Sequence, residues 1–320
     1  MEQAPRVSND TVLVTGASGF MGSHLCRRLL DSGASVHGIY RTAPAGDAGN
    51  VRWWRVDLGD AQAVRALIAD LRPDVVFHLA GFVSGDRRLD AVLPALQSNL
   101  VGTVHLLSAL AEFSCRRVVI AGSMEEPDPR DAVVVAASPY AAAKYAATAY
   151  ARMFHALYEI PVVIARIFVV YGPGQRDLRK VVPYVTLSLL RHQTPELSSG
   201  SRLVDWIYID DVVDGLLASA SAKNAIGGTF DLGSGTLTSV RDVAMQLSKI
   251  IGPNTRIAFG NVPDRAREPI RLANVSETSE RLGWTASISI ADGLDRTVAW
   301  YGKWLQSGGL EKSEGNSQHV

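Results

Sequence analysis

The sequence predicts an α/β protein: a Rossmann-type, doubly wound parallel β-sheet followed by a smaller C-terminal domain. Two observations predict the larger part. Short apolar runs alternate with helical patterns, and a glycine-rich turn joins the first run to the first helix. The smaller domain is predicted because this alternation stops near residue 170, where Gly172, Pro173 and Gly174 open a region of shorter, mixed elements.

The predicted strands are mostly continuous apolar runs, a pattern that suits parallel strands buried on both faces. They span residues 12–15, 35–40, 51–56, 75–79, 118–121 and 162–167. Helical patterns fill the intervals between them, at residues 21–31, 61–69, 95–113 and 140–158. This βαβ alternation predicts a sheet with helices on both of its faces.

The domain boundaries follow from the same pattern. We expect the Rossmann domain to span residues 1–168 and the smaller domain to span residues 169–305. Residues 206–222 are expected to pack back on the first domain. The tail at 306–320 is rich in Gly, Ser and charged residues, so we expect it to be disordered.

Composition excludes several classes of protein. The 32 Lys and Arg residues balance the 32 Asp and Glu residues, so no global charge favours nucleic acid or a membrane surface. The two cysteines imply no disulfide framework and favour a reducing compartment. No apolar run approaches the roughly 20 residues that span a bilayer, and we expect a cytoplasmic protein. The seven histidines lack metal-ligand spacing, so we expect no metal.

The turn after the first predicted strand predicts a dinucleotide site. Gly16, Gly19 and Gly22 let the chain turn sharply, approach a pyrophosphate closely and pack the following helix against the sheet. The N-terminus of that helix offers free N–H groups to phosphate oxygens. The predicted cofactor contacts at this turn are Gly16, Ser18, Gly19, Phe20, Met21 and Gly22.

The segment at residues 15–25 resembles the first turn of extended short-chain dehydrogenases/reductases, the nucleotide-sugar epimerase, dehydratase and ketoreductase family. Other matching positions follow in order along the chain, to about residue 300. The resemblance implies a nucleotide-sugar substrate bound by the smaller domain and a homodimer formed through a four-helix bundle of residues 95–113 and 140–158. It also implies further cofactor contacts from Asp57, Leu58, Leu79, Ala80, Gly81 and Ile167.

The end of the second predicted strand bears on the choice of cofactor. An acidic residue at this place would hold the adenosine ribose hydroxyls, but the chain has Tyr40 and Arg41 there. Arg41 can pair with a 2′-phosphate, as the resemblance to GDP-mannose dehydratase and its partner reductase implies. We therefore expect NADP(H) in preference to NAD(H). The alternative is that Arg41 is a solvated loop residue.

The predicted catalytic residues combine spacing with the resemblance. Tyr140 and Lys144 stand four apart on one face of a predicted helix, where the ammonium can stabilise a tyrosinate and hold a ribose. Ser123 follows the fifth predicted strand, at the place where the family has a Ser or Thr that binds the reacting sugar oxygen. Ser123, Tyr140 and Lys144 together match the family's catalytic triad.

Glu125 leaves the type of reaction open. Dehydratases and decarboxylases of the family carry a Glu two positions after this Ser or Thr, so Glu125 is a candidate acid/base, and the alternative is a loop carboxylate. Met124 replaces the aspartate of one class of dehydratase. The pair of acids also resembles GDP-4-keto-6-deoxymannose reductases.

The substrate contacts are predicted from basic and polar side chains that match the family's pattern. Arginine suits a diphosphate because its planar guanidinium binds phosphate oxygens in pairs. Two departures weaken the match, since Val169 replaces an asparagine and Val204 replaces an arginine. The predicted contacts are Ser84, Arg166, Arg202 and Arg265.

Three functions remain open at this point. The first is an NADPH-dependent reductase that acts on the 4-keto group of a nucleotide-activated deoxysugar, with Tyr140 as the acid. The second is a 4-epimerase or a 4,6-dehydratase that recycles its cofactor. The third is an NADP-sensing regulator without catalysis, against which the complete Ser-Tyr-Lys set argues.

Overall fold

The larger lobe is built on seven parallel strands. The computed structural model describes residues 9–41, 49–128, 130, 134–175, 177–264 and 268–309. The strands of the sheet are β1 (Thr11–Thr15), β2 (Ser35–Tyr40), β3 (Arg52–Arg55), β4 (Val75–His78), β5 (Arg117–Ser123), β6 (Val162–Ile167) and β10 (Thr229–Leu232). Their order across the sheet is β10-β6-β5-β4-β1-β2-β3. Successive strands are therefore added on one side of β1 up to β3 and on its other side from β4 onward. This doubly wound sheet confirms the fold class predicted from the sequence.

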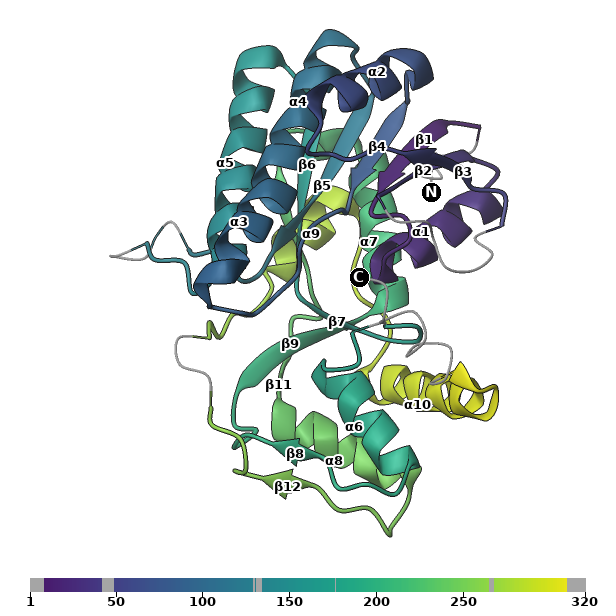
Figure 1. Ribbon diagram of the computed structural model, residues 1–320, viewed down its shortest axis with the longest axis vertical. Helices are drawn as coiled ribbons and strands as arrows, with labels where there is room; N and C mark the ends of the chain where they lie inside the picture. Colours follow the sequence, from purple (N-terminus) through teal and green to yellow (C-terminus); the bar gives the residue numbers. More distant parts are fainter. Residues whose placement is uncertain are drawn as a thin grey trace.

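Helices cover both faces of this sheet (Figure 1). On one face, α2 (Ala61–Leu71), α4 (Gly102–Glu112) and α5 (Pro139–Tyr158) bury apolar side chains against the strands. On the other face, α1 (Phe20–Asp31) and α7 (Ile209–Ser221) pack side by side. The apolar core of that second face continues into the smaller lobe. The two lobes are therefore joined through a shared core.

The segment at residues 95–113, expected to form one helix, is divided into several helical pieces. A 3₁₀ turn, η1 (Leu89–Ala91), leads into α3 (Val92–Ala95), and a π-helical segment, η2 (Leu96–Val101), precedes α4. The wide turn buries Asn99 completely. Its side chain accepts from the backbone N–H of Phe82 at 3.1 Å and donates to the carbonyl of Phe82 at 3.0 Å. Such π-helical turns occur often at functional sites.

The smaller lobe is made of short strands and three helices. One sheet contains β7 (Val169–Tyr171), β9 (Leu203–Tyr208) and β11 (Leu237–Ser239), and a two-stranded sheet pairs β8 (Glu196–Leu197) with β12 (Ala258–Phe259). The helices α6 (Val181–Leu190), α8 (Val240–Ile251) and α10 (Ile290–Gln306) pack together beside them. No helix in the described part of the chain is long and apolar enough to cross a membrane.

The chain returns to the larger lobe after β9. Residues 206–208 complete β9, α7 then packs on β5 and β6, and β10 pairs with β6 at the edge of the main sheet. A 3₁₀ turn, η3 (Lys223–Ala225), lies between them, and α9 (Val275–Leu282) packs against β10. The main sheet thus takes one strand from the segment at 169–305. Residues 310–320 of the predicted tail lie outside the described residues.

Candidate active site

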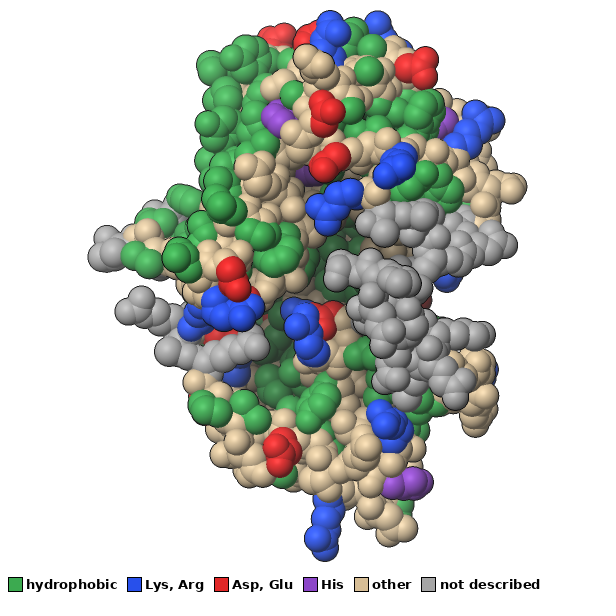
Figure 2. Space-filling model, in the orientation of Figure 1, with side chains coloured by type: hydrophobic (Ala, Val, Ile, Leu, Met, Phe, Trp, Pro, Cys, Tyr) green, Lys and Arg blue, Asp and Glu red, His purple; other side chains and the backbone are tan. Residues whose placement is uncertain are grey.

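The predicted functional residues gather where the parallel strands end. The carboxyl ends of β1, β4, β5 and β6 lie side by side, because these strands are neighbours in the sheet. In doubly wound sheets, ligands bind outside this edge, at the point where the strand order reverses. Figure 2 shows a hollow between the two lobes in this region.

Two positions at the turn between β1 and α1 have space only for glycine. Gly16 has φ +70°, and a Cβ there would lie 2.8 Å from the backbone nitrogen of Ala80. At Gly22, a Cβ would lie 2.1 Å from the carbonyl oxygen of Gly16. The N–H of Gly19 closes the turn by donating to that same carbonyl at 2.9 Å. The glycines predicted from the sequence are therefore fixed by contacts between backbones.

The N-terminus of α1 fits a pyrophosphate. Its N-cap residue, Gly19, makes no side-chain capping hydrogen bond, and the first turn contains no acidic residue. The backbone N–H groups there are free of side-chain acceptors, and the helix dipole favours an anion beside them. Ser18, Phe20 and Met21 flank this position as half-buried residues. A nicotinamide dinucleotide fits this turn.

A chain of hydrogen bonds supports the loop that follows β4. The N–H of Ala80 donates to Thr15 Oγ1 at 3.1 Å, and Thr15 Oγ1 lies 2.8 Å from His78 Nδ1. On the other side of the ring, His78 Nε2 lies 2.9 Å from Thr103 Oγ1, which donates to the carbonyl of Asn99. Because Thr103 Oγ1 gives its proton to Asn99, we assign the proton of neutral His78 to Nε2. Burial lowers the pKa of His78 to about 3.

The other predicted cofactor residues lie around the same edge. Leu79 and Ala80 are half-buried beside the glycine turn, Gly81 is exposed, and Ile167 is buried at the end of β6. Asp57 is exposed after β3, with Oδ1 accepting from the N–H of Gly59 at 2.8 Å.

The end of β2 carries positive charge. Arg41 is exposed there, and Arg55, which ends β3, pairs in register with Tyr40 and is also exposed. Within the described residues, no carboxylate forms an ion pair with Arg41 or Arg55. Residues 42–48 lie outside the described part. Both guanidinium groups are therefore available to an anion from this side.

The three predicted catalytic side chains meet at the end of β5. Ser123 is the last residue of β5, and its hydroxyl hydrogen-bonds to Tyr140. Tyr140 and Lys144 lie on the first two turns of α5, which begins with Pro139 after the N-cap Ser138. Lys144 Nζ donates to the carbonyl of Ala121 at 2.8 Å. All three residues are almost fully buried, and each is at most 8% exposed.

Burial sets the protonation of the catalytic pair. It raises the pKa of the Tyr140 phenol, an effect that hydrogen bonding to Ser123 reduces and that the charges of Glu125 and Glu126 increase. Burial lowers the pKa of Lys144 to about 8, and the charge of Glu126 opposes this change. At neutral pH, Tyr140 is therefore a protonated phenol beside a mostly charged ammonium group.

Of the two adjacent acids, the sequence prediction named only Glu125. The N–H of Glu125 donates to Ser123 Oγ at 3.2 Å, and its charge acts on Tyr140. Glu126, which was not predicted, is only 3% exposed, and its Oε1 accepts from the N–H of Ser123 at 2.7 Å. When two acidic residues follow a strand side by side, the sequence does not show which of them is buried.

Three of the four predicted substrate contacts already have protein partners. Arg166 Nη1 donates to Asp231 Oδ1 at 2.8 Å, so its guanidinium is anchored to β10. Arg202 Nη1 pairs with Glu268 at 3.0 Å. Ser84 Oγ accepts from the N–H of Asp86. Arg265 lies outside the described residues.

Arg271, which the sequence did not single out, extends from the smaller lobe toward the loop after β5. Its Nη2 lies 4.0 Å from Asp128 Oδ2, and its side chain is 17% exposed. No motif distinguishes it in the sequence, because Arg271 lies in an irregular segment before α9.

Comparison with known proteins decides the family. The model of the NAD dependent epimerase/dehydratase family matches residues 12–233. The chain belongs to this family. It is 32% identical over 311 residues to a UDP-glucose 4-epimerase of Mycolicibacterium smegmatis, covering 90% of this chain and 97% of the relative. It is 28% identical to a probable dTDP-glucose 4,6-dehydratase of Sinorhizobium fredii, covering 92% and 94%.

A solved structure of the family has the same fold. The UDP-glucuronic acid 4-epimerase of Bacillus cereus, in complex with UDP-glucuronic acid and NAD, has a TM-score of 0.81 and 27% identity, covering 92% of this chain and 99% of that one. Family membership confirms the predicted enzyme class: an NAD(P)-dependent extended short-chain dehydrogenase/reductase of the nucleotide-sugar epimerase and dehydratase group.

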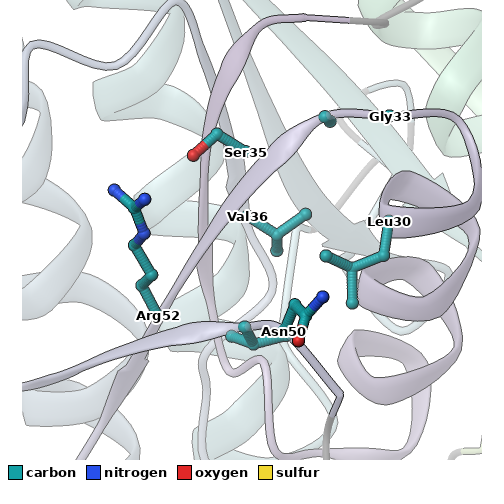
Figure 3. A pocket seen from close by; sticks show the side chains of 8 residues that line it. Leu30, Gly33, Ser35, Val36, Asn50 and Arg52 are labelled. Atoms are coloured by element: carbon teal, nitrogen blue, oxygen red, sulfur yellow. The ribbon is translucent and has the colours of Figure 1, made fainter.

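One pocket lies away from this family's functional edge (Figure 3). It is lined by Leu30, Gly33, Ala34, Ser35, Val36, Asn50, Val51 and Arg52. Ser35 begins β2 and pairs with Thr11 at the start of β1, so this pocket lies at the amino ends of the strands. The glycine turn is at their carboxyl ends, and the pocket is therefore not the dinucleotide site.

In the described residues, no cluster of His, Cys, Asp and Glu is arranged to hold a metal ion.

Proposed function

We propose that this enzyme reduces the 4-keto group of a nucleotide-activated deoxysugar with NADPH. One observation carries the proposal: the buried phenol of Tyr140 is hydrogen-bonded to Ser123, with Lys144 one turn further along the same helix. A carbonyl that becomes a hydroxyl needs a proton donor, and a phenol with a raised pKa is protonated at neutral pH.

Each of the three side chains has a role in this proposal. Ser123 donates a hydrogen bond to the sugar oxygen and holds it beside Tyr140. Tyr140 gives its proton to that oxygen as negative charge develops there. Lys144, charged and fixed by the carbonyl of Ala121, stabilises the resulting tyrosinate and binds the cofactor ribose. The bound nicotinamide supplies the hydride.

The preference for NADPH rests on the end of β2. The chain has Tyr40 and Arg41 where an acidic residue would hold the ribose, and both Arg41 and Arg55 are exposed without an ion pair among the described residues. A 2′-phosphate placed beside them would gain charge-assisted hydrogen bonds. A carboxylate at this place would repel it.

A 4-epimerase is the second candidate, since the UDP-glucose 4-epimerase relative is similar over nearly its whole length. An epimerase uses the same three side chains, because it oxidises and then reduces the same carbon. A 4,6-dehydratase needs a further acid or base, for which Glu125 is the candidate. Met124 gives no such help, because its side chain is apolar and buried.

The experiment that tests the proposal compares two probes. Purified enzyme is given NADPH with dTDP-4-keto-6-deoxyglucose, or a catalytic amount of cofactor with UDP-glucose. Net loss of NADPH absorbance with the keto sugar is expected. UDP-galactose formed without net cofactor change would replace the reductase by an epimerase.

Glu125→Gln separates reduction from dehydration. A reductase needs no second acid/base, so we expect the variant to keep most of its turnover. A dehydratase must remove a proton next to the new carbonyl, and its rate would fall at least about a hundredfold. A loss of that size, measured with dTDP-glucose, would contradict the reductase proposal.

We also propose a homodimer formed by helices of the larger lobe. Apolar side chains are exposed along one edge of this lobe, where Figure 2 shows a continuous hydrophobic surface over α3 and α5. Leu93 and Leu157 are each 66% exposed. Contiguous exposed apolar surface of this kind marks protein interfaces. The residues are Leu89, Val92, Leu93, Leu96, Tyr150, Leu157 and Tyr158.

The mass in solution tests this interface. Light scattering at micromolar concentration should give twice the 34.4 kDa of one chain. Leu93→Glu should give the monomer mass, because it buries a charge in the apolar contact. Met245→Glu is the matched control, since Met245 is an exposed apolar residue on α8 of the smaller lobe. A monomeric native protein would rule the dimer out.

A further inference from the structure

A buried carboxylate lies directly behind the catalytic residues. Glu126 is 3% exposed, and its Oε1 accepts the N–H of Ser123 at 2.7 Å. The hydroxyl of Thr148, one turn beyond Lys144 on α5, donates to the same carboxylate. A carboxyl group with these bonds is held in one place, because both the strand end and the helix fix it.

The sequence makes room for this carboxylate. A Cβ at Gly122 would lie 2.9 Å from Glu126 Oε1 and 3.1 Å from Ile164 Cγ2. The first of these distances is too short for any real Cβ contact, so a larger residue would displace the carboxylate. Gly122 lies inside β5, where glycine weakens a strand and often marks a close approach of another group. Here the approaching group is Glu126.

Positive and negative charges alternate around Glu126. Lys144 lies on the α5 side and Arg166 on the β6 side, and each favours the ionised form of Glu126. Arg166 in turn pairs with Asp231 of β10, which also accepts the N–H of Asn274 at 2.9 Å. Because Arg166 and Asp231 neutralise each other, the negative charge of Glu126 balances the positive charge of Lys144.

We propose that Glu126 is a positioning residue of the proposed reaction, which holds Ser123 at the end of β5 and supplies a negative charge to the buried site that contains Lys144. Its acceptor oxygen fixes the backbone of Ser123, and its negative charge acts on the ammonium group of Lys144, the proposed ribose ligand. The inference rests on the proposed function for its purpose, but its test needs only the cofactor.

The sign of the charge effect follows from the surroundings. Burial lowers the pKa of Lys144 to about 8, and the charge of Glu126 raises it again. Removing that charge therefore lowers the pKa of Lys144 further, and the ammonium is lost at a lower pH. The same charge raises the pKa of Tyr140, which keeps the phenol protonated. Glu126 itself has its pKa raised by burial, with the hydrogen bonds from Ser123 and Thr148 opposing this.

Other titratable groups nearby do not reproduce this effect. His78 faces Lys144 from β4 and is neutral, because burial lowers its pKa to about 3. Glu125 acts on Tyr140 from the loop, and Arg166 and Asp231 neutralise each other as an ion pair. The groups that surround Glu126 and Lys144 are Ser123, Glu125, Tyr140, Thr148, Arg166, Asp231 and His78.

The test measures NADPH and NADH binding by cofactor fluorescence from pH 6 to 10. In the native protein, affinity should fall as pH rises past about 8, where Lys144 loses its proton. Glu126→Gln keeps the size and an acceptor oxygen but removes the charge, so this midpoint should move lower by about one pH unit. Glu112→Gln is the matched control, since it removes an ion-paired carboxylate on α4 and should leave the midpoint unchanged.

Two more variants separate charge from packing. Glu126→Asp keeps the charge on a shorter side chain, so turnover should fall while the midpoint stays near the native value. Equal midpoints for Glu126→Gln and the native protein, or equal shifts for Gln and Asp, would overturn the proposal. If Glu126→Gln does not fold, Gly122→Ala displaces the carboxylate and should lower the midpoint, and an unchanged midpoint again overturns it.

The outcomes also separate this inference from the proposed function. A native protein that binds NADPH with the expected pH dependence, yet turns over neither dTDP-4-keto-6-deoxyglucose nor UDP-glucose, would defeat the proposed function alone. Turnover of the keto sugar, together with a pH midpoint of cofactor binding that Glu126→Gln leaves unchanged, would defeat the inference alone.

Discussion

Two turns at the same edge of the sheet are built in opposite ways. The turn after β1 holds its shape through contacts between backbones, with Gly16 and Gly22 placed where a Cβ would collide. The turn after β5 holds its shape through buried charge, with Glu126 bonded to the N–H of Ser123. The first turn is specified by glycines, which have no side chain. The second is specified by the groups that surround the side chain of Glu126. Only the first kind of constraint leaves a local pattern in the sequence.

This comparison predicts different sensitivities. In the backbone-built turn, cofactor binding depends on shape, so side-chain changes at its rim should alter affinity modestly. In the charge-built turn, each buried polar group has partners, so a single substitution should change the chemistry strongly.

The largest expected effect is that of Tyr140→Phe. Loss of a positioned general acid lowers kcat at least about a hundredfold. NADPH affinity should barely change, because the ring still fills its buried site and Lys144 still binds the ribose. Lys144→Ala should damage both quantities, since that residue has two roles. Stopped-flow turnover and fluorescence titration measure the two effects, and normal turnover by Tyr140→Phe would refute the catalytic assignment.

How much the sequence predicted follows the same division. The glycine turn was predicted from its spacing after a strand, and the Ser123, Tyr140 and Lys144 set from spacing together with the resemblance to the family. The β10 strand was missed because its four residues, Thr229–Leu232, are too few to form a distinctive apolar pattern. Glu126 was missed because two adjacent acids look alike until the fold buries one of them. Arg166 was predicted as a substrate contact from its resemblance to the family's motif, and its ion pair with Asp231 was not foreseen because that partner is 65 residues away.

A smaller effect is expected at the rim of the backbone-built turn. Arg41→Ala should remove the preference for NADPH over NADH, with NADPH affinity falling about tenfold, which is about 1.4 kcal/mol. NADH affinity should stay the same, because only the 2′-phosphate meets this guanidinium. Arg52→Ala is the matched control, an exposed arginine at the start of β3, away from the carboxyl edge. Native protein that binds both cofactors equally would make the NADP assignment wrong.

The smallest expected effect tests whether the N-cap of α5 helps to position Tyr140. Ser138 caps α5 by accepting from the N–H of Ala141 at 3.1 Å, and Ser239 caps α8 in the smaller lobe by accepting from the N–H of Asp242 at 3.0 Å. Replacing either with Ala should cost about 1 kcal/mol of unfolding free energy, which denaturant titration can measure. Only Ser138→Ala should also lower kcat, by about threefold, because the frayed turn carries Tyr140 and a displaced acid transfers its proton less well. Equal turnover in the two variants would mean that buried contacts around Tyr140, rather than the helix cap, fix its position.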